Sequence, residues 1–374
     1  MSPSTARFDP AKPYKDLPRL PPETEVEGRP ILKALVDAHS ALAGLKQAGH
    51  LIPNQAILTN TIPILEARAS SEIENIVTTA DRLFQFAQDE REPADAATKE
   101  ALRYRTALRR GVELLKTRPV TTLMAVEVCR TLRGIDIDIR RTPGTALTNL
   151  ATGAVVYTPP EGEPLLRDLL ANWERYLHDA GEVDPLVRMA VSHYQFEAIH
   201  PFTDGNGRTG RILNLLYLVE QQLLDLPVLY LSRSIIATKA DYYRRLSEVT
   251  SAGAWEPWIL YVLNAVRDTA RWTTAKIHAI RDLLAHTTAH VQKEAASLYT
   301  RELVELIFVQ PCSRIGAVVN AGLAQRQTAS EYLKELCGIG VLHEVKVGRE
   351  KLFLHPKLLT LLASDEHTFE PYKS

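Results

Sequence analysis

The chain has 374 residues, which is longer than one compact core usually requires and predicts two or three packed units. Hydrophobic residues make up 45% of the sequence and charged residues 24%, ordinary values for a globular protein that exclude a disordered or fibrous chain. Lys and Arg total 44 against 45 Asp and Glu, so the formal net charge is -1. This balance excludes a chain-wide electrostatic attraction to nucleic acid or to an anionic membrane.

The three cysteines, Cys129, Cys312 and Cys337, are widely spaced and include no CxxC pair. This pattern favours reduced thiols over a disulfide framework or a zinc site. The first thirty residues hold seven prolines and have no apolar stretch long enough for a signal peptide. No segment approaches the roughly 20 apolar residues that a membrane-spanning helix needs. We therefore expect a cytoplasmic location and no membrane partner.

Helical spacing of apolar residues dominates the chain apart from its start and one break in the first half. The proline-rich start should be extended, and the stripes that follow it predict a helical N-terminal region over residues 1–110. Between Asp136 and Pro160 the helical pattern stops, and a β-prone run over residues 154–158 predicts a β-hairpin. Helical patterns resume in residues 165–177, 185–198, from 207 onward, 239–250 and 255–284.

The last part of the chain, residues 271–374, is predicted to contain a linker helix and a small separate domain. Three helical stripes (298–308, 315–321 and 327–336) precede two strand patterns (341–347 and 351–354), which is typical of a winged-helix-like α+β domain. A DNA-binding version would use residues 324–336 as its recognition helix, with Arg326, Gln327 and Ser330 exposed. Residues 298–358 hold eight Lys and Arg and six Asp and Glu, so their net charge of +2 favours protein contact or dimerisation as much as DNA binding.

The most informative segment is 200–211, which lies between two helical patterns. Gly205, Asn206 and Gly207 can adopt positive φ and turn consecutive backbone N–H groups toward one point, which predicts an anion site. The helix that begins there adds its positive end to the same site.

Charged side chains in this segment supply the remaining parts of a phosphate site. Arg208 and Arg211 are three residues apart on one helix face, where both guanidinium groups can bind phosphate oxygens. Asp204 is suited to hold Mg²⁺ beside those phosphates. His200, with an unperturbed pKa of about 6.5, can take a proton from an attacking hydroxyl, and Phe202 is expected to anchor the loop in the core. Each residue alone has an ordinary structural interpretation, but together they favour phosphoryl or nucleotidyl transfer.

This segment resembles the signature of the Fic family, His-x-Phe-x-Asp/Glu-Gly-Asn-Gly/Lys-Arg-x-x-Arg, at every defined position from His200 to Arg211. The resemblance implies a helical Fic core over residues 111–270 and transfer of AMP from ATP to a Ser, Thr or Tyr hydroxyl of a target protein. By the same resemblance, His200 is the general base and Asp204 the Mg²⁺ ligand. Gly205 to Gly207 form the phosphate-binding hole, and Arg208 and Arg211 contact the phosphates, with Arg211 on the γ-phosphate.

Two further segments resemble parts of the family. The predicted hairpin near residues 142–158 is similar to the flap that holds the target as an added strand, although an ordinary surface hairpin remains the alternative. The sequence from Ser70 to Asn75 resembles the inhibitory pattern Ser/Thr-x-x-x-Glu-Gly/Asn. This second resemblance implies that Glu74 occupies Arg211 and keeps ATP in an unproductive pose, whereas a solvated helical carboxylate is the alternative.

The nucleotide-base site departs from the family. Many relatives carry an Asn-x-Gly-Asp-like stretch after the tyrosine pair, where this chain has Ser251-Ala-Gly253-Ala254. Tyr242 and Tyr243 could offer an aromatic wall to adenine, and since adjacent helical residues face different ways, at most one should do so. We assign this position to Tyr243.

Two functions from different classes follow from these patterns. In the first, the chain is an autoinhibited protein adenylyltransferase that uses ATP and Mg²⁺, and its C-terminal domain finds or arranges partners. In the second, it is a DNA-binding winged-helix regulator whose Fic lobe senses nucleotide. The intact His200 favours the first. Removal of AMP from targets, self-modification, a homodimer and nucleic-acid binding all remain open.

Overall fold

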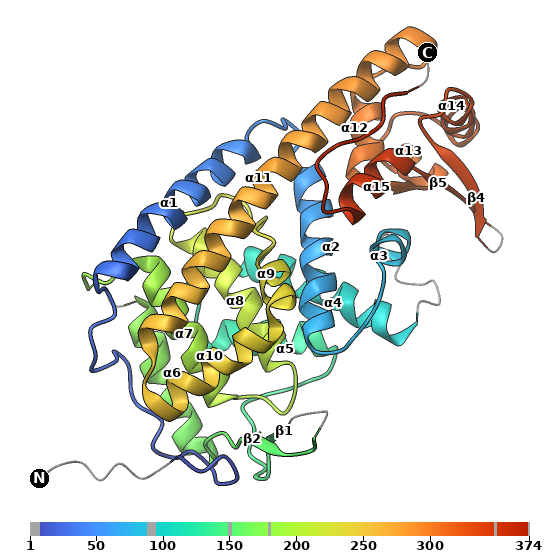
Figure 1. The fold of residues 1–374 in the computed structure, drawn as a ribbon. Coiled ribbons are helices and arrows are strands. Elements are labelled where there is room, and N and C mark those ends of the chain that lie inside the picture. Colours follow the sequence, from blue (N-terminus) through green and yellow to red (C-terminus); the bar gives the residue numbers. More distant parts are fainter. Residues whose placement is uncertain (1–7, 88–94, 149–151, 179–180, 348–349, 373–374) are drawn as a thin grey trace, which may run out of the picture.

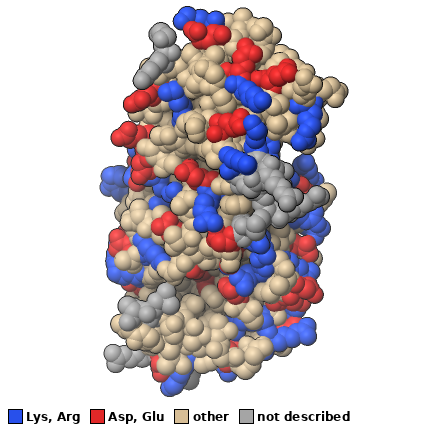
Figure 2. Space-filling model, turned by 90° about the vertical axis from the view of Figure 1, so that its right-hand side faces the viewer, with Lys and Arg blue, Asp and Glu red and all other residues tan. Residues whose placement is uncertain are grey.

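The computed structural model describes residues 8–87, 95–148, 152–178, 181–347 and 350–372, and within these ranges the chain is mainly helical (Figure 1). The prediction of a mainly α protein with small β elements is therefore confirmed. In the described part of the chain, no helix combines the length and apolar character needed to cross a membrane. Basic and acidic side chains are interspersed on the face drawn in Figure 2, in keeping with the nearly balanced charge.

The described residues of the N-terminal region form the helices α1 (Arg29–Gly49), α2 (Ala56–Ile73), α3 (Ala80–Phe86) and α4 (Ala96–Leu115). Figure 1 shows α1 lying along the long helix α11 (Trp255–Glu294). The helix α2 is held by the carboxylate of Glu66, which is fully buried. This carboxylate accepts hydrogen bonds from the Tyr104 hydroxyl (3.0 Å), the Ser232 amide (2.9 Å) and the Ser232 hydroxyl. Burial raises the pKa of Glu66. These bonds fix the helix that carries Ser70.

The central helices enclose the predicted motif. They are α5 (Thr122–Arg133), α6 (Glu163–His178), α7 (Pro185–Ile199), α8 (Asn206–Glu220), α9 (Leu231–Ala237) and α10 (Lys239–Ala252). Almost every residue of α7 and of the first three turns of α8 is buried, so these two helices form the centre of the core. The loop that joins them holds the motif at the edge of this core.

The predicted hairpin is present as β1 (Leu147–Thr148) and β2 (Val155–Tyr157), which pair antiparallel with Leu147 opposite Tyr157. Of the predicted range 142–158, residues 149–151 lie outside the described residues. In Figure 1 the hairpin and the C-terminal unit lie at opposite ends of the molecule.

The C-terminal unit contains three predicted helices, two predicted strands and two elements that the sequence analysis missed. Its elements are α12 (Arg301–Val309), β3 (Cys312–Ser313), α13 (Ile315–Asn320), α14 (Arg326–Gly338), β4 (His343–Val347), β5 (Glu350–Leu354) and α15 (Pro356–Ala363). The strands form one antiparallel sheet in the order β3-β5-β4. The two-residue strand β3 is too short to give an alternating pattern, and the single apolar face of α15 was not recognised as a helix.

Helix α11 joins the core to the C-terminal unit. It runs without a break through residue 270, where the sequence analysis divides the chain. Its buried Lys276 donates to the carbonyl oxygens of Leu361 (2.6 Å), Ser364 (2.9 Å) and Glu366 (2.6 Å), and burial lowers the pKa of Lys276 to about 8. These bonds attach the end of α15 to α11.

Close packing of α4 on α8 gives a first prediction. A methyl group at Gly111 would lie 2.4 Å from the buried Leu216 side chain, whereas one at the exposed Gly44 of α1 would meet nothing within 4 Å. We expect Gly111→Ala to lower the free energy of unfolding by about 1–3 kcal/mol through overpacking. Gly44→Ala should raise it by about 0.5–1 kcal/mol, because alanine favours helix. Denaturant unfolding measures both, and equal effects at the two sites would contradict this packing.

Candidate active site

The loop between α7 and α8 is shaped by two left-handed residues. Helix α7 ends where His200 adopts φ 50° and ψ 60°, with its N–H donating to the Phe196 carbonyl at 3.0 Å. A residue other than glycine in this region costs about 1–3 kcal/mol, so the surrounding contacts must hold it there. Gly205 then takes φ 86° at the start of α8, where glycine carries no such cost.

Asn206 closes the loop with its side chain. Its Oδ1 accepts from the Phe202 amide at 2.8 Å, and its Nδ2 donates to the Phe202 carbonyl at 2.9 Å. Phe202 is completely buried, as expected for the loop anchor. Because the Asn206 side chain bonds to the Phe202 backbone, it does not cap α8. The backbone N–H groups at the start of α8 can therefore bind an anion. No side chain caps α8.

A carboxylate already lies against this helix start. A Cβ placed on Gly207 would be 2.4 Å from Glu74 Oε1 and 3.0 Å from Arg211 Nη1, so only glycine allows this approach. Glu74 follows the last residue of α2, whose helical path ends as Asn75 takes φ 63°. The carboxylate of Glu74 therefore occupies the surroundings in which the sequence predicts a phosphate.

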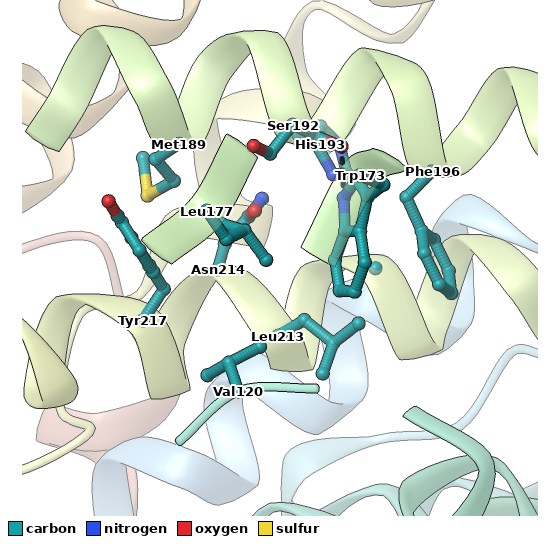
Figure 3. A pocket seen from close by; sticks show the side chains of 11 residues that line it. Val120, Trp173, Leu177, Met189, Ser192, His193, Phe196, Leu213, Asn214 and Tyr217 are labelled. Carbon is teal, nitrogen blue, oxygen red and sulfur yellow. Dashed lines mark hydrogen bonds between the residues drawn. The ribbon is translucent and has the colours of Figure 1, made fainter. Parts of the chain in front are cut away.

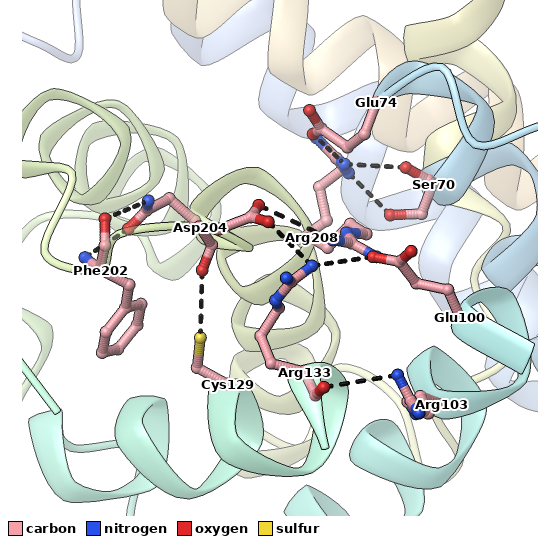
Figure 4. A network of polar contacts seen from close by, with 11 residues as sticks. Ser70, Glu74, Glu100, Arg103, Cys129, Arg133, Phe202, Asp204 and Arg208 are labelled. Carbon is pink, nitrogen blue, oxygen red and sulfur yellow. Dashed lines mark hydrogen bonds and ion pairs between the residues drawn. The ribbon is translucent and has the colours of Figure 1, made fainter. Parts of the chain in front are cut away.

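Arg211 is buried against the segment from Ser70 to Glu74 at the end of α2. Its Nη2 donates to Glu74 Oε1 at 2.7 Å and to the Ser70 carbonyl at 3.0 Å, while its Nε donates to Ser70 Oγ at 2.8 Å (Figure 4). Only 1% of the Arg211 side chain is exposed. Burial is the largest influence on Glu74 and disfavours its ionised form, but the charge and hydrogen bond of Arg211, together with the charges of Arg208 and His200, lower the pKa of Glu74 below its ordinary value of 4.5. The structure thus brings Ser70, Glu74 and Arg211 together.

A second charged network surrounds Arg208 and Asp204 (Figure 4). Glu100 Oε1 on α4 accepts from Arg208 Nη1 at 2.7 Å and from Arg133 Nη1 at 2.9 Å. Arg133 Nη1 also lies 2.8 Å from Asp204 Oδ2, and Arg208 Nη2 lies 3.9 Å from Asp204 Oδ1. Sequence reasoning missed Glu100 and Arg133, because both lie far from the motif in the chain and neither belongs to a recognisable pattern.

Asp204 has the chemistry of a magnesium ligand, and 56% of its side chain is exposed. Among the described residues, no group of three or more His, Cys, Asp or Glu side chains could hold a metal ion. A single carboxylate fits an ion whose other positions are filled by water and by nucleotide phosphates, as Mg²⁺ commonly requires.

His200 has a different proton affinity from the one the sequence suggested. Burial and, next to it, the charge of Arg140 lower the pKa of His200 to about 4, although the Glu197 carbonyl and the carboxylates of Glu74 and Asp204 act in the opposite direction. The unperturbed value of about 6.5 used in the sequence analysis is therefore wrong for this environment. The imidazole is neutral at pH 7 and can accept a proton.

The tyrosine pair of α10 divides as the sequence analysis expects. Tyr242 is buried and its hydroxyl lies 2.9 Å from His193 Nε2, whereas Tyr243 is 45% exposed. Tyr243 is therefore the member of the pair that a ligand in solution can reach. Its contact with adenine stays a prediction.

A small cavity lies behind the motif, between α6, α7 and α8 (Figure 3). Its volume of about 10 Å³ is enough for about one water molecule. Ser192, His193, Asn214 and Tyr217 line it, and each has a buried polar atom without a hydrogen-bond partner in the described part of the chain. This cavity is therefore too small for a substrate.

The contact between Glu74 and Arg211 gives a second prediction. We expect Glu74→Gln to lower the free energy of unfolding by about 1–3 kcal/mol at pH 7, because buried Arg211 loses its anionic partner. Since the folded-state pKa of Glu74 is below 4.5, this contribution is present above that value and is lost as pH falls through the folded pKa. The difference between the two proteins in the free energy of unfolding should therefore narrow as pH falls below 4.5, as measured by denaturant unfolding.

Glu72→Gln is the matched control, because the side chain of Glu72 makes no ion pair in the described ranges. It should change stability little at either pH. A loss as large as that of Glu74→Gln, or a Glu74→Gln effect that does not depend on pH, would contradict the ion pair.

Known protein families resemble this chain in three regions. Three family models match the chain: "Fic/DOC family N-terminal" over residues 32–113, "Fic/DOC family" over 130–218, and "Protein adenylyltransferase SoFic-like, C-terminal domain" over 283–358. The chain is 36% identical over 108 residues to protein adenylyltransferase fic-1 of Caenorhabditis briggsae, a match covering 28% of this chain and 20% of that protein.

A second relative and a solved structure extend the comparison. The chain is 43% identical over 67 residues to a probable protein adenylyltransferase of Aquifex aeolicus, covering 18% of this chain and 20% of the relative. The chain thus spans about a fifth of the length of the curated relatives that it matches. A Fic family protein from Desulfovibrio desulfuricans G20 shares the fold, with a TM-score of 0.58 at 21% identity over 89% of this chain and 98% of that one. The chain thus carries the N-terminal and core domains of the Fic/DOC family and a SoFic-like C-terminal domain.

Proposed function

We propose that this protein transfers AMP from ATP to a Ser, Thr or Tyr hydroxyl of a target protein. The observation that carries the proposal is the neutral imidazole of His200 beside a helix start that combines free N–H groups with two buried guanidinium groups. The names of the matched relatives and of the C-terminal family model support the same activity.

The proposed reaction assigns one task to each group. The backbone from Gly205 to Gly207 and the guanidinium groups of Arg208 and Arg211 bind the triphosphate of ATP, and exposed Tyr243 lies against the adenine. Mg²⁺ held by Asp204 neutralises phosphate charge. His200 accepts the proton of the target hydroxyl as its oxygen attacks the α-phosphorus. The new O–P bond forms as the bond to the β-phosphate oxygen breaks, and pyrophosphate leaves.

The target hydroxyl must be brought to His200, and the hairpin β1–β2 is suited to this task. The Tyr157 hydroxyl of β2 donates to the Ala198 carbonyl at 2.8 Å, two residues before His200. An extended target segment that pairs with the hairpin backbone would therefore lie near the imidazole. Main-chain pairing would admit many target sequences.

We further propose that Glu74 inhibits the resting enzyme. Its carboxylate is bonded to Arg211 at 2.7 Å and lies against Gly207, where the γ-phosphate would also bind. Two anions cannot share these donors without strong repulsion, so bound ATP would be turned away from in-line attack. Displacement of Glu74 would restore the productive pose.

The C-terminal unit is proposed to contact a protein partner or a second copy of the chain. Arg326 and Gln327 at the start of α14 are exposed, while Ser330, which the DNA-binding interpretation requires to be exposed, is half-buried. Duplex DNA binding remains the alternative hypothesis. We propose a cytoplasmic location because ATP is available there and the three cysteines are free.

The third prediction tests catalysis and inhibition together. Glu74→Gly should raise covalent labelling by ATP with a tagged α-phosphate by about tenfold or more, because Arg211 becomes available to the γ-phosphate. Adding His200→Ala should reduce labelling by about a hundredfold or more, since the base is lost. Intact-mass analysis of the protein and of lysate targets detects the added AMP.

Glu72→Gly is the control for the glycine itself, and it should label no faster than the unmodified protein. Equal labelling of the unmodified protein, Glu74→Gly, Glu74→Gly with His200→Ala, and Glu72→Gly would contradict both the transfer activity and the inhibitory role of Glu74.

A further inference from the structure

Arg140 lies outside the signature motif, yet it contacts the backbone on both sides of His200. It follows α5 in the connection that leads to the hairpin, and its side chain is buried. Its Nε donates to the His200 carbonyl at 2.8 Å and its Nη2 to the Ile199 carbonyl at 3.4 Å. Its own backbone N–H donates to the Pro201 carbonyl at 2.9 Å. One residue thus binds three consecutive carbonyl groups centred on the left-handed His200.

The same guanidinium also reaches the hairpin. Arg140 Nη2 donates to the carbonyl of Pro160, which follows β2 after two residues. Together with the bond from the Tyr157 hydroxyl to the Ala198 carbonyl, this contact joins the hairpin to the end of α7. These bonds therefore fix the position of the hairpin relative to the His200 imidazole.

Arg140 makes no ion pair with a carboxylate within the residues that the structure describes. Buried arginines usually have such a partner, so its charge is here balanced by carbonyl dipoles, including that of Ile199 at the negative end of α7. An arginine that only filled space would not need this arrangement. The planar guanidinium suits carbonyl groups in several directions, which a lysine ammonium on one flexible stem cannot match.

We propose that Arg140 is a positioning residue for AMP transfer. It holds His200 in its left-handed conformation against the base of the hairpin, so that the imidazole meets a hydroxyl presented there. This inference rests on the proposed function, because it assigns Arg140 a role in the same reaction.

Electrostatics adds a second effect of the same contact. After burial, the charge of Arg140 is the next cause that lowers the pKa of His200, to about 4, against the opposing Glu197 carbonyl, Glu74 and Asp204. A neutral replacement should therefore raise the pKa of the imidazole. Because the base acts in its neutral form, the acidic limb of the rate profile should move to higher pH.

The test compares Arg140→Lys, Arg140→Gln and Arg141→Gln, each combined with Glu74→Gly. Arg141 is the matched control, because it is the adjacent residue, is exposed and pairs with Glu163 instead of the loop. The readouts are the labelling rate between pH 5 and 8, KM for the target, and the His200 titration by NMR, with His200→Ala used to assign the signal.

We expect Arg141→Gln to behave as its parent. Arg140→Lys should lower kcat by about tenfold or more with little change in KM, because the charge and the backbone bond to Pro201 remain but the guanidinium bonds to the His200 and Ile199 carbonyls are lost. Its His200 pKa should stay low. Arg140→Gln should lower kcat similarly and also shift both the imidazole pKa and the acidic limb upward.

The proposal would be overturned if both Arg140 variants had the same kcat and the same His200 pKa as the Glu74→Gly parent. If neither variant folds, a crystal structure of the parent decides, and an Arg140 side chain that does not contact the His200 and Ile199 carbonyls would overturn the proposal. The NMR titration needs no nucleotide. Absence of labelling in every protein would therefore count against the proposed function, while the titration still reports on Arg140.

Discussion

Buried positive charge at the start of α8 is the constraint on which the rest of the structure depends. Arg208 and Arg211 are exposed by only 2% and 1%, and they add to the positive end of the helix that carries them. Burying such charges is costly unless they are paired and hydrogen-bonded. The N-terminal region supplies one for each arginine, with Glu100 of α4 at Arg208 and Glu74 after α2 at Arg211.

This arrangement links folding to the proposed catalysis. The carboxylates that satisfy the arginines in the described structure also attach α2 and α4 to the core. A triphosphate that binds the same arginines must replace part of these contacts, so nucleotide binding and packing of the N-terminal region compete. Bonds from Tyr104 and Ser232 to Glu66 hold the middle of α2 in place. The competition with nucleotide therefore concerns only the end of this helix, next to Glu74.

The sequence predicts those parts of the candidate site whose residues follow one another in a short segment of the chain. Residues 200–211 carry the proposed base, the turn and the arginines in one segment, and the helices around them follow from regular apolar spacing. The six residues from Ser70 to Asn75 could also be recognised as a pattern, and the structure brings them to Arg211.

Contacts between distant segments could not be predicted in this way. Arg140 reaches His200 across 60 positions and Glu100 reaches Arg208 across 108, and no local pattern marks either residue. The low pKa of His200 arises from burial, which depends on the tertiary fold. The division of the chain at residue 270 followed from the resemblance to the Fic core, and it cuts through the helical pattern predicted over residues 255–284, which the structure extends to Trp255–Glu294.

The most direct measurement of the central claim is a crystal structure of the Glu74→Gly protein with Mg²⁺ and a non-hydrolysable ATP analogue. We predict the γ-phosphate on Arg211, the other phosphates against the N–H groups of α8, and the α-phosphorus facing His200. A triphosphate bound away from the start of α8, with Arg211 still enclosed by α2, would contradict the account.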